Sequence, residues 1–553
     1  MRILPCGPHA VLLEFDSLDE VLAAHRRLRA AVESGGPWAA VTDLVPAART
    51  LLVVTANPAA LSAALVERLA EGPSSIERED GDEVVVPTIY DGDDLAEVAR
   101  LTGLTVDEVI AAHTGTLWRA AFGGFAPGFV YLVGGDPRLR VPRLSSPRTR
   151  VPAGAVALAD EFSGVYPTAS PGGWRLIGRT DAVLFDSVAA SPSLIAPGDT
   201  VRFVSSSEEP RQSFPEEPRG TSGVRSFPEE PRGTSGVRSV PEEPRGTSGV
   251  SKGPIAGTGT GTAHEAQRLA DSQCKRALVV ERALLPVLVQ DRGRPGLGAV
   301  GVSASGAADR AAYELGARLV GNERGEAALE ITLGQAAFTA RGALTVALTG
   351  APCPAGVGGR AVSHAVVFAV GDGETLTLGA PSAGLRTYLS ARGGIDAVEV
   401  LGSRARDTLG GLGPAPLKAG DEVSLGPTPP GWAPGVDVVP LPPVPDVATL
   451  RYLPGPRADW VEGLAASEWT VGDAVDRVGV RLTGRPLARR GGELPSEGVV
   501  RGAIQVPPSG EPVLFLADHP PTGGYPVVGV LTDASADAAA QLRPGDRVRL
   551  DPV

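Results

Sequence analysis

The sequence predicts a β-rich α+β protein in which short strands and tight turns outnumber helices. Glycine and proline, at 71 and 51 of 553 residues, are both more frequent than usual. Aromatic residues make up only 5%, so the cores must be built from Val, Leu, Ile and Ala. Residues 122–179 show the pattern most densely, because turn signals such as Ala-Pro-Gly at 126–128 and Pro-Gly-Gly at 171–173 interrupt short apolar runs.

The first part of the chain divides into a small α+β domain, 1–78, and a strand-rich domain, 79–205. Apolar residues recur with helical spacing in some segments and with strand spacing in others. The expected elements are strands at 10–15, 50–54 and 84–89, amphipathic helices at 18–32 and 58–69, and two short helices at 93–101 and 106–112.

Residues 206–265 have a different character. A 13-residue unit, SFPEEPRGTSGVR, fills 213–225, recurs unchanged at 226–238 and returns in altered form at 239–251. Such a polar repeat has no apolar face to bury, which predicts a disordered linker. A flexible segment of about 55 residues spans on the order of 40 Å. The sequence therefore predicts two globular halves, joined like two separate proteins fused into one chain.

The second half, 266–553, again alternates apolar runs with glycine and proline. One helix is expected from about 307 to 320, with Ser305 near its start, and the Pro-rich segment 427–447 suggests an inner boundary. Strands are expected at 277–284, 344–349, 365–370, 375–378, 387–389, 498–504 and 513–517.

Composition excludes several classes of function. A net charge of −13 without a basic stripe argues against a nucleic-acid partner. No stretch of about 18 apolar residues occurs, which predicts no membrane span. The first residues show no signal peptide, and Cys6, Cys274 and Cys353 are isolated, so a reducing cytoplasm is expected. None of the three lysines lies in a P-loop motif. Met1 is the only methionine, so the Met-Lys-Met segment usual for attached biotin is absent.

The first half resembles the B subunit of 5-oxoprolinase, a family that includes the kinase inhibitor KipI and was once labelled allophanate hydrolase subunit 1. The matching residues are His113-Thr114, Gly124-Phe125-Ala126-Pro127-Gly128-Phe129, Pro142-Arg143, Pro147-Arg148, Val151-Pro152-Ala153-Gly154 and Ser170-Pro171-Gly172-Gly173-Trp174. Trp118 stands where the family often has tyrosine.

The second half resembles the C subunit of 5-oxoprolinase, a KipA-like family. The matching residues include Gln290-Asp291, Gly293-Arg294-Pro295-Gly296, Ser305-Gly306-Ala307 with Asp309, Leu401-Gly402-Ser403-Arg404 and Thr522-Gly523-Gly524-Tyr525. After Ser403-Arg404 the family usually continues with Ser-Thr, but this chain has Ala405-Arg406.

The resemblance implies cyclophilin-like β-barrels in both halves. It implies that the chain, with a separate 5-oxoprolinase A component, opens the small amide 5-oxoproline to glutamate at the expense of ATP with Mg²⁺. The same pair of modules also resembles the carboxyltransferase part of urea carboxylase, which moves a carboxyl group from biotin to an amide. A third implication, from KipI, is a non-enzymatic regulator of a kinase. Whether the chain forms a homo-oligomer is left undecided by the sequence.

Site candidates in the first half follow from residue type and motif. His113 is the candidate base, since histidine exchanges protons near neutral pH; the alternative is a histidine that caps its helix. Guanidinium groups suit phosphate or carboxylate, although a solvated loop is the alternative. The candidates for binding substrate or phosphate are Arg143, Arg148, Arg150, Phe125, Pro127, Gly128, Gly154, Gly172 and Gly173.

In the second half, Asp291 and Arg294 are expected to orient the substrate or a metal-bound phosphate, and both are placed among the catalytic candidates. Ser305 and Asp309 are binding candidates, with helix capping as the alternative. Gly523 and Gly524 form a turn whose amides suit a ligand or a simple hairpin. No metal-ligand spacing stands out, so the metal site stays unknown. We expect the active cleft to lie between the two halves.

Overall fold

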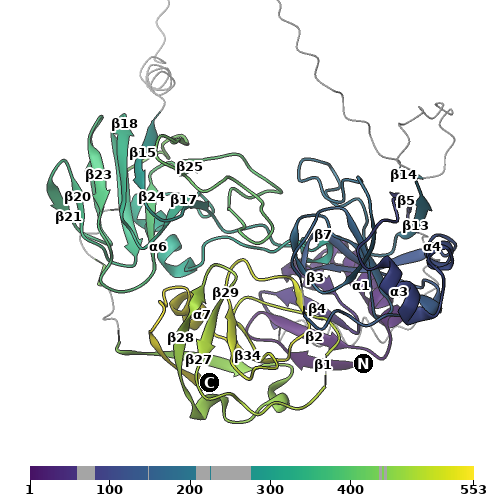
Figure 1. Ribbon diagram of the computed structural model, residues 1–553. Helices are drawn as coiled ribbons and strands as arrows, with labels where there is room; N and C mark the ends of the chain where they lie inside the picture. Colours follow the sequence, from purple (N-terminus) through teal and green to yellow (C-terminus); the bar gives the residue numbers. More distant parts are fainter. Residues whose placement is uncertain are drawn as a thin grey trace, which may run out of the picture.

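The computed structural model describes residues 1–58, 81–146, 148–206, 224–225, 276–434, 439–440, 445–492 and 494–553. These residues form four packed units (Figure 1). The predicted linker 206–265 and the predicted helix at 58–69 lie almost entirely outside the described residues, as do parts of the segment 427–447.

The N-terminal unit (residues 1–58) is a four-stranded antiparallel sheet with one helix against it. The strand order is β1-β2-β4-β3. Helix α1 (Leu18–Ser34) begins where Ser17 accepts a hydrogen bond from the Glu20 amide, and it buries Val21 and Leu28 against the sheet. The expected strands and the helix at 18–32 are confirmed. The strands are β1 (Arg2–Pro5), β2 (Ala10–Glu14), β3 (Val41–Pro46) and β4 (Thr50–Thr55).

The first barrel (residues 81–206, with 224–225) is a curved sheet with order β12-β9-β10-β7-β6-β13-β5-β14. A bridge between Ile89 and Arg179 joins its two sides, and β5 pairs in parallel with β13. Helices α3 (Leu95–Thr102) and α4 (Val106–Thr114) pack on it, as predicted. The strands are β5 (Glu83–Thr88), β6 (Trp118–Gly124), β7 (Ala126–Val133), β9 (Ala155–Ala159), β10 (Phe162–Val165), β12 (Arg175–Arg179), β13 (Thr200–Ser205) and β14 (Val224–Arg225), with β8 (Arg148–Val151) and β11 (Ser170–Gly172) as a separate pair.

The two-sheet lobe (residues 276–426) packs a seven-stranded sheet on a five-stranded one around Phe338, Leu348 and Leu389. Helix α6 (Arg310–Val320) covers the outer face of the second sheet. The strands are β15 (Ala277–Ala283), β16 (Val287–Gln290), β17 (Ala328–Thr332), β18 (Ala336–Arg341), β19 (Leu344–Gly350), β20 (Ala355–Val357), β21 (Arg360–Val362), β22 (Val367–Val370), β23 (Thr375–Leu378), β24 (Arg386–Ala391), β25 (Ile395–Asp396) and β26 (Glu422–Leu425).

The C-terminal barrel (residues 447–552) is closed, with order β27-β34-β31-β32-β29-β28-β35. Its first and last strands pair in parallel. Helix α7 (Asp533–Ala539) packs beside β27. The strands are β27 (Val447–Pro454), β28 (Glu468–Val475), β29 (Gly479–Thr483), β31 (Ala503–Gln505), β32 (Val513–Phe515), β34 (Val527–Leu531) and β35 (Arg547–Pro552), with β30 (Glu497–Gly498) and β33 (Thr522–Gly523) as a separate pair.

The β-rich class with barrel-like sheets in both halves is confirmed, whereas three expected elements differ in detail. Helix α6 begins at Arg310 instead of 307, because Asp309 caps it and Ser305 lies in the left-handed region at φ 53°. The strand expected at 498–504 is broken by a turn with Gly502 at φ 84°. The strand expected at 365–370 begins at Val367, because Ala365 has φ 56°.

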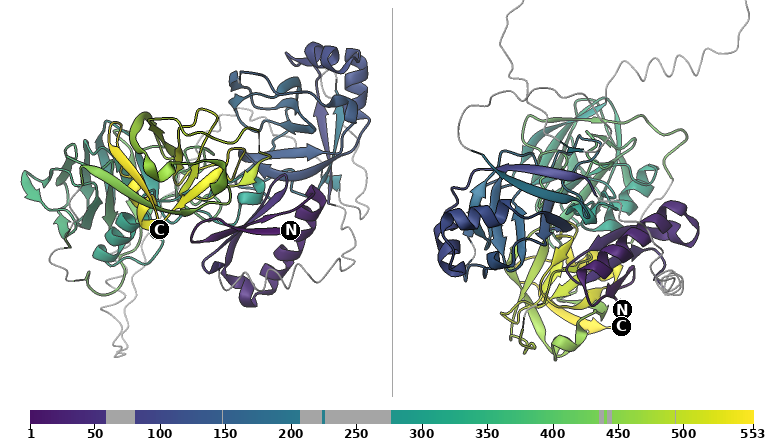
Figure 2. Two further views of the ribbon diagram at one scale, coloured as in Figure 1. Left: turned by 90° about the horizontal axis from the view of Figure 1, so that it is seen from below. Right: turned by 90° about the vertical axis from the view of Figure 1, so that its right-hand side faces the viewer.

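The N-terminal unit packs directly on the C-terminal barrel (Figure 2). Cys6, Leu12 and Leu52 share a buried cluster with Val499 and Val530. Residues far apart in the sequence therefore form one core. None of the helices in the described ranges is long and apolar enough to cross a membrane.

Candidate functional site

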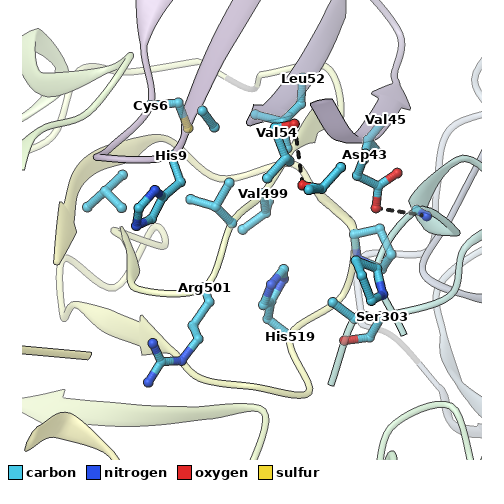
Figure 3. Close-up of a pocket in the computed structure, with 18 of the residues that line it drawn as sticks. Cys6, His9, Asp43, Val45, Leu52, Val54, Ser303, Val499, Arg501 and His519 are labelled. Atoms are coloured by element: carbon cyan, nitrogen blue, oxygen red, sulfur yellow. Dashed lines mark hydrogen bonds between the residues drawn. The ribbon is translucent and has the colours of Figure 1, made fainter. Parts of the chain in front are cut away.

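A cavity of about 140 Å³ lies where the two halves meet. The N-terminal unit contributes Leu52 and Val54, and the C-terminal barrel contributes Val499, so one wall is apolar. Asp43, His519 and Arg501 supply charge and proton-binding groups (Figure 3). A cavity of this size accepts a small ring, since an engineered cavity of about 150 Å³ binds benzene.

Asp43 lies on β3 and faces a short 3₁₀ turn of the second half, Gly298–Val300. Its Oδ2 accepts a hydrogen bond from the Gly298 amide at 3.2 Å, and its Oδ1 accepts one from the Leu44 amide at 2.9 Å. Burial raises the pKa of Asp43 to about 6. This carboxyl group can therefore hold or release a proton close to neutral pH.

His519 comes from the C-terminal barrel and is buried. Its Nδ1 lies 2.9 Å from the Pro520 carbonyl oxygen. A carbonyl can only accept, so Nδ1 carries the proton and Nε2 keeps a lone pair. Burial lowers the pKa of His519 to about 4, so the ring is neutral at pH 7. His519 is thus a neutral hydrogen-bond acceptor at the cavity wall.

Two arginines and a histidine complete the polar part of the cavity. Arg310 lines it at the start of α6. Arg501 donates to Asp537 Oδ1 at 2.6 Å and to the Ala308 carbonyl at 2.8 Å. At the rim, His9 of the first half lies 2.6 Å from Asp533 of the second. An apolar wall, cations and proton-binding groups around a small space are typical of a site for a small polar molecule.

A buried ionic network holds the lobe and the C-terminal barrel together behind this cavity. The Arg477 guanidinium donates to Asp518 at 2.9 and 3.0 Å and to Glu330 at 2.5 Å. Burial alone would raise the pKa of Asp518, but Arg477 holds that pKa below its usual range. Ser305 donates to Asp518 at 2.6 Å. Because Asp518 immediately precedes His519, the network also fixes the cavity wall.

Segments that carried the sequence motifs of both halves converge at the same junction. A Cβ at Gly124 would collide with Thr522 Oγ1, and one at Gly123 would collide with the Ala299 carbonyl. A Cβ at Gly410 would lie 3.0 Å from Pro127 Cγ. The chain around the turn from β6 to β7 is therefore pressed against three segments of the second half.

His113 lies inside the first barrel, away from this junction. It is fully buried at the end of α4 and packs on Phe203 and Trp118. Its Nδ1 is 2.7 Å from Tyr90 Oη and its Nε2 is 2.9 Å from Ser163 Oγ. Burial lowers its pKa to about 3. This placement favours a structural histidine; a role as base stays a prediction.

The three arginine candidates do not converge on one point. Arg148 donates a hydrogen bond to Asp94 at 2.8 Å and another to the Trp174 carbonyl. It therefore links β8 to the start of helix α3. Arg143 lies 3.5 Å from Asp160 and is half exposed. Arg150 is exposed on β8. Only Arg143 and Arg150 are thus open to a dissolved anion.

The candidate turn residues of the first half mostly shape the backbone. Phe125, between β6 and β7, has φ 65°, and Gly128, within β7, has φ 78°, so the chain bends at both positions. Gly154, at φ 80°, lies against the Thr180 carbonyl. Gly172 packs under the Tyr166 ring, and the Gly173 carbonyl accepts from the Leu144 amide at 2.8 Å.

In the second half, Asp291 accepts hydrogen bonds from Ser403 Oγ and the Arg404 amide, both at 2.6 Å, so it anchors that loop. Asp309 accepts a hydrogen bond from the Ala312 amide at 2.9 Å, so it caps helix α6, which was the alternative to binding a ligand. Arg294 is buried and donates to two carbonyls of the same loop. Gly523 and Gly524 lie in the turn around β33, Gly523 beside Gln505.

Sequence reasoning missed Asp43, His519 and Arg501, which line the cavity. None of the predicted site residues is among the lining residues, although Arg294, Ser305 and Asp309 are direct neighbours of lining residues. His519 lies three positions before the motif that starts at Thr522, and this proximity was the one signal in the sequence. Asp43 is neither part of a motif nor next to one.

The fold and this junction define the class of protein. Residues 1–195 match the family described as "Carboxyltransferase domain, subdomain C and D", and residues 300–552 match "Carboxyltransferase domain, subdomain A and B". The two halves are therefore complementary carboxyltransferase-type domains.

The relatives define the family more closely. The 5-oxoprolinase B subunit from Escherichia coli O157:H7 is 36% identical over 208 residues, which cover 36% of this chain and 94% of the relative. The 5-oxoprolinase C subunit from Escherichia coli K12 is 34% identical over 283 residues, which cover 49% and 89%. The crystal structure of TTHA0988 is 32% identical, with a TM-score of 0.78 and coverage of 98% and 99%. The chain belongs to the family of 5-oxoprolinase B and C proteins and contains counterparts of both.

Proposed function

We propose that this chain is the fused B–C component of a 5-oxoprolinase, which works with a separate A component to open 5-oxoproline to glutamate. The observation that carries the proposal is the cavity between the halves. Asp43 from the B counterpart and His519 from the C counterpart line one space large enough for a small ring. Neither half alone would provide both groups.

The residues around the cavity suit an amide ring that bears a carboxylate. The apolar wall of Leu52 and Val54 packs against the ring carbons. Arg310 and Arg501 provide positive charge for the carboxylate or for charge that develops on the amide oxygen. Asp43 accepts or donates a proton, since its pKa is near 6.

ATP and Mg²⁺ belong to this proposal through the resemblance alone. A cavity of about 140 Å³ is too small for a nucleotide, so its residues do not fit ATP. No group of three or more His, Cys, Asp or Glu side chains that could hold a metal gathers in the described part of the chain. We assign the nucleotide to the contact with the A component.

A second candidate is transfer of a carboxyl group to an amide. It is favoured by the description of the family that matches both halves. The biotin would have to arrive on another chain, since Met1 is the only methionine here. Both reactions act on an amide, so the cavity serves either.

The test is glutamate release from 5-oxoproline with ATP and Mg²⁺, with and without the counterpart of the A component. We expect release only with both proteins and ATP. Asp43→Asn should lower kcat/KM about 100-fold or more, because a positioned base contributes that much. Asp372→Asn is the matched control and should stay within a few-fold, because Asp372 also accepts a backbone hydrogen bond, from the Gly342 amide at 2.7 Å, but is exposed and does not line the cavity. No release with two folded proteins would turn the proposal toward biotin-dependent transfer.

A further inference from the structure

Arg310 lines the cavity between the halves, and its guanidinium has no hydrogen-bond or ion-pair partner among the described residues. Its backbone amide, in contrast, donates to Asp537 Oδ1 at 2.9 Å. A guanidinium offers five N–H donors and stays charged at neutral pH. A free cation at a cavity wall therefore suits an anionic group on a bound molecule.

The other charged groups at this end of the cavity are already paired. Arg501 donates to Asp537 Oδ1 at 2.6 Å. Asp533 lies 2.6 Å from His9 Nε2. Both carboxylates also attract Arg310 from a greater distance, but neither forms an ion pair with it. Each carboxylate therefore has a closer partner, and the charge of Arg310 is left without one.

Arg310 is both accessible and surrounded by protein. The residue is exposed, and it lines a space of about 140 Å³. Desolvation by the protein around it, followed by the charge of Arg501, lowers the pKa of Arg310 to about 10, so the side chain stays positive at pH 7. Weaker solvation strengthens its attraction for an anion compared with that of a surface arginine. The cavity therefore provides both the space and the charge for an anionic group.

The charged groups of the cavity lie at two ends. Figure 3 shows Asp43 and Arg501 on opposite sides of it. Burial is the main reason for the low pKa of His519, and the charges of Arg310 and Arg501 lower that pKa further. Both arginines therefore lie on the His519 side. A molecule bound between Arg310 and Asp43 would meet a cation at one end and a proton-binding carboxyl group at the other.

We propose that Arg310 binds a carboxylate of the substrate, so that the cavity accepts amides that bear an acid and rejects neutral amides such as urea. In 5-oxoproline the carboxylate and the ring amide are separate groups, which would meet Arg310 and Asp43 respectively. Arg501, which Asp537 holds, is assigned to the structure of the wall. This inference rests on the proposed function, because it names the class of amide that the same cavity accepts. It also separates the two candidate reactions, since urea carries no charge.

The test is binding to the full chain, without ATP or the A component, measured by NMR titration. The probes are 5-oxoproline, 2-pyrrolidone, which is the same ring without the carboxylate, and urea. We expect 5-oxoproline to bind about 10- to 100-fold more tightly than 2-pyrrolidone, because hydrogen bonds to a charged group contribute that much. Equal affinity for the two lactams, tighter binding of urea, or no binding of any probe to the folded wild type would overturn the inference.

The variant Arg310→Gln should weaken binding of 5-oxoproline by the same factor and change binding of 2-pyrrolidone by no more than a few-fold, because the ring alone does not need the cation. Arg310→Lys keeps the charge and should retain part of the affinity. The matched control is Arg318→Gln on the same helix, because Arg318 is exposed, pairs with Glu314 at 3.6 Å and does not line the cavity. Equal losses for both lactams in Arg310→Gln would contradict the assignment, since Arg310 would then act on the ring or on the fold.

Glutamate release distinguishes failure of this inference from failure of the proposed function. If the two lactams bind equally but the wild type with the A component releases glutamate, the proposed function survives and Arg310 does not select the acid. If the acid is preferred through Arg310 but no glutamate forms, the substrate class stands and the reaction is a different one.

Discussion

The two halves bury polar groups in different ways. In the first barrel, His113 is neutral, and each ring nitrogen has one partner, Tyr90 or Ser163. At the junction of lobe and C-terminal barrel, Arg477, Asp518 and Glu330 are charged and buried together. Next to them, Arg294 and Asp407 each keep one atom without a partner among the described residues.

The comparison distinguishes buried polar residues that only stabilise the fold from those that suit chemistry. The His113 group is closed: its hydrogen bonds are made within the barrel, and both ring nitrogens are already used. The charged network fixes the backbone of several loops, and close to it a donor of Arg294 and an acceptor of Asp407 stay without a partner among the described residues. The second arrangement is the more typical of a functional site.

The largest effect is expected at the charged network. Arg477→Met should lower the free energy of unfolding by about 3–5 kcal/mol, because Asp518 and Glu330 would remain buried without their counter-charge. Urea unfolding measures this loss. Arg490→Met is the control, since its pair with Asp459 is exposed and should leave the midpoint unchanged. Equal midpoints for both variants would show that the buried network stabilises the fold no more than an exposed ion pair does.

A smaller effect is expected from pH at His113. Its pKa is about 3 in the folded protein, below the ordinary value of 6.5. Unfolded chains therefore bind a proton below pH 6.5 that the folded protein does not, so stability is lost as the pH falls. Between about pH 6.5 and 5 the loss should be about 2 kcal/mol for one such histidine.

The measurement compares urea unfolding of wild type and His113→Gln at the two pH values. The free energy of unfolding should fall less between the two pH values in the variant than in the wild type. His25 and His519 contribute equally to both proteins. Glutamate release per folded molecule should stay within about 10-fold of wild type, because a positioned base would account for at least about 100-fold. A loss of about 100-fold with unchanged stability would instead make His113 the base.

The smallest effect is expected from cutting the chain between the halves. A protease site introduced within residues 206–265 should leave both pieces associated in size-exclusion chromatography. They share the buried cluster around Leu52 and Val530, and Arg457 of the second half donates to Glu14 at 2.6 Å. Dissociation of the cut but otherwise intact protein would show that the two halves are independent bodies.

Sequence reasoning succeeded where the signal is local. Glycine and proline spacing predicted the β-rich class, and apolar spacing placed α1 and α4. The cavity could not be located in this way, because Asp43 meets Gly298 across 255 positions of sequence. The surroundings of His113 could not be predicted either, because Tyr90 and Ser163 reach it from other parts of the barrel, 23 and 50 positions away in the sequence. Its role as a base stays a prediction.

In both barrels the first strand pairs in parallel with a strand from the end of the same barrel's sequence, β5 with β13 and β27 with β35. Each pair of partners lies far apart in the sequence, so closure has a high entropic cost and should be slow. During synthesis, β27 can pair with β35 only after Pro552, the last residue of β35, has been made. The first barrel, by contrast, can close while the second half is still on the ribosome. The order of the halves therefore also sets the order in which they fold.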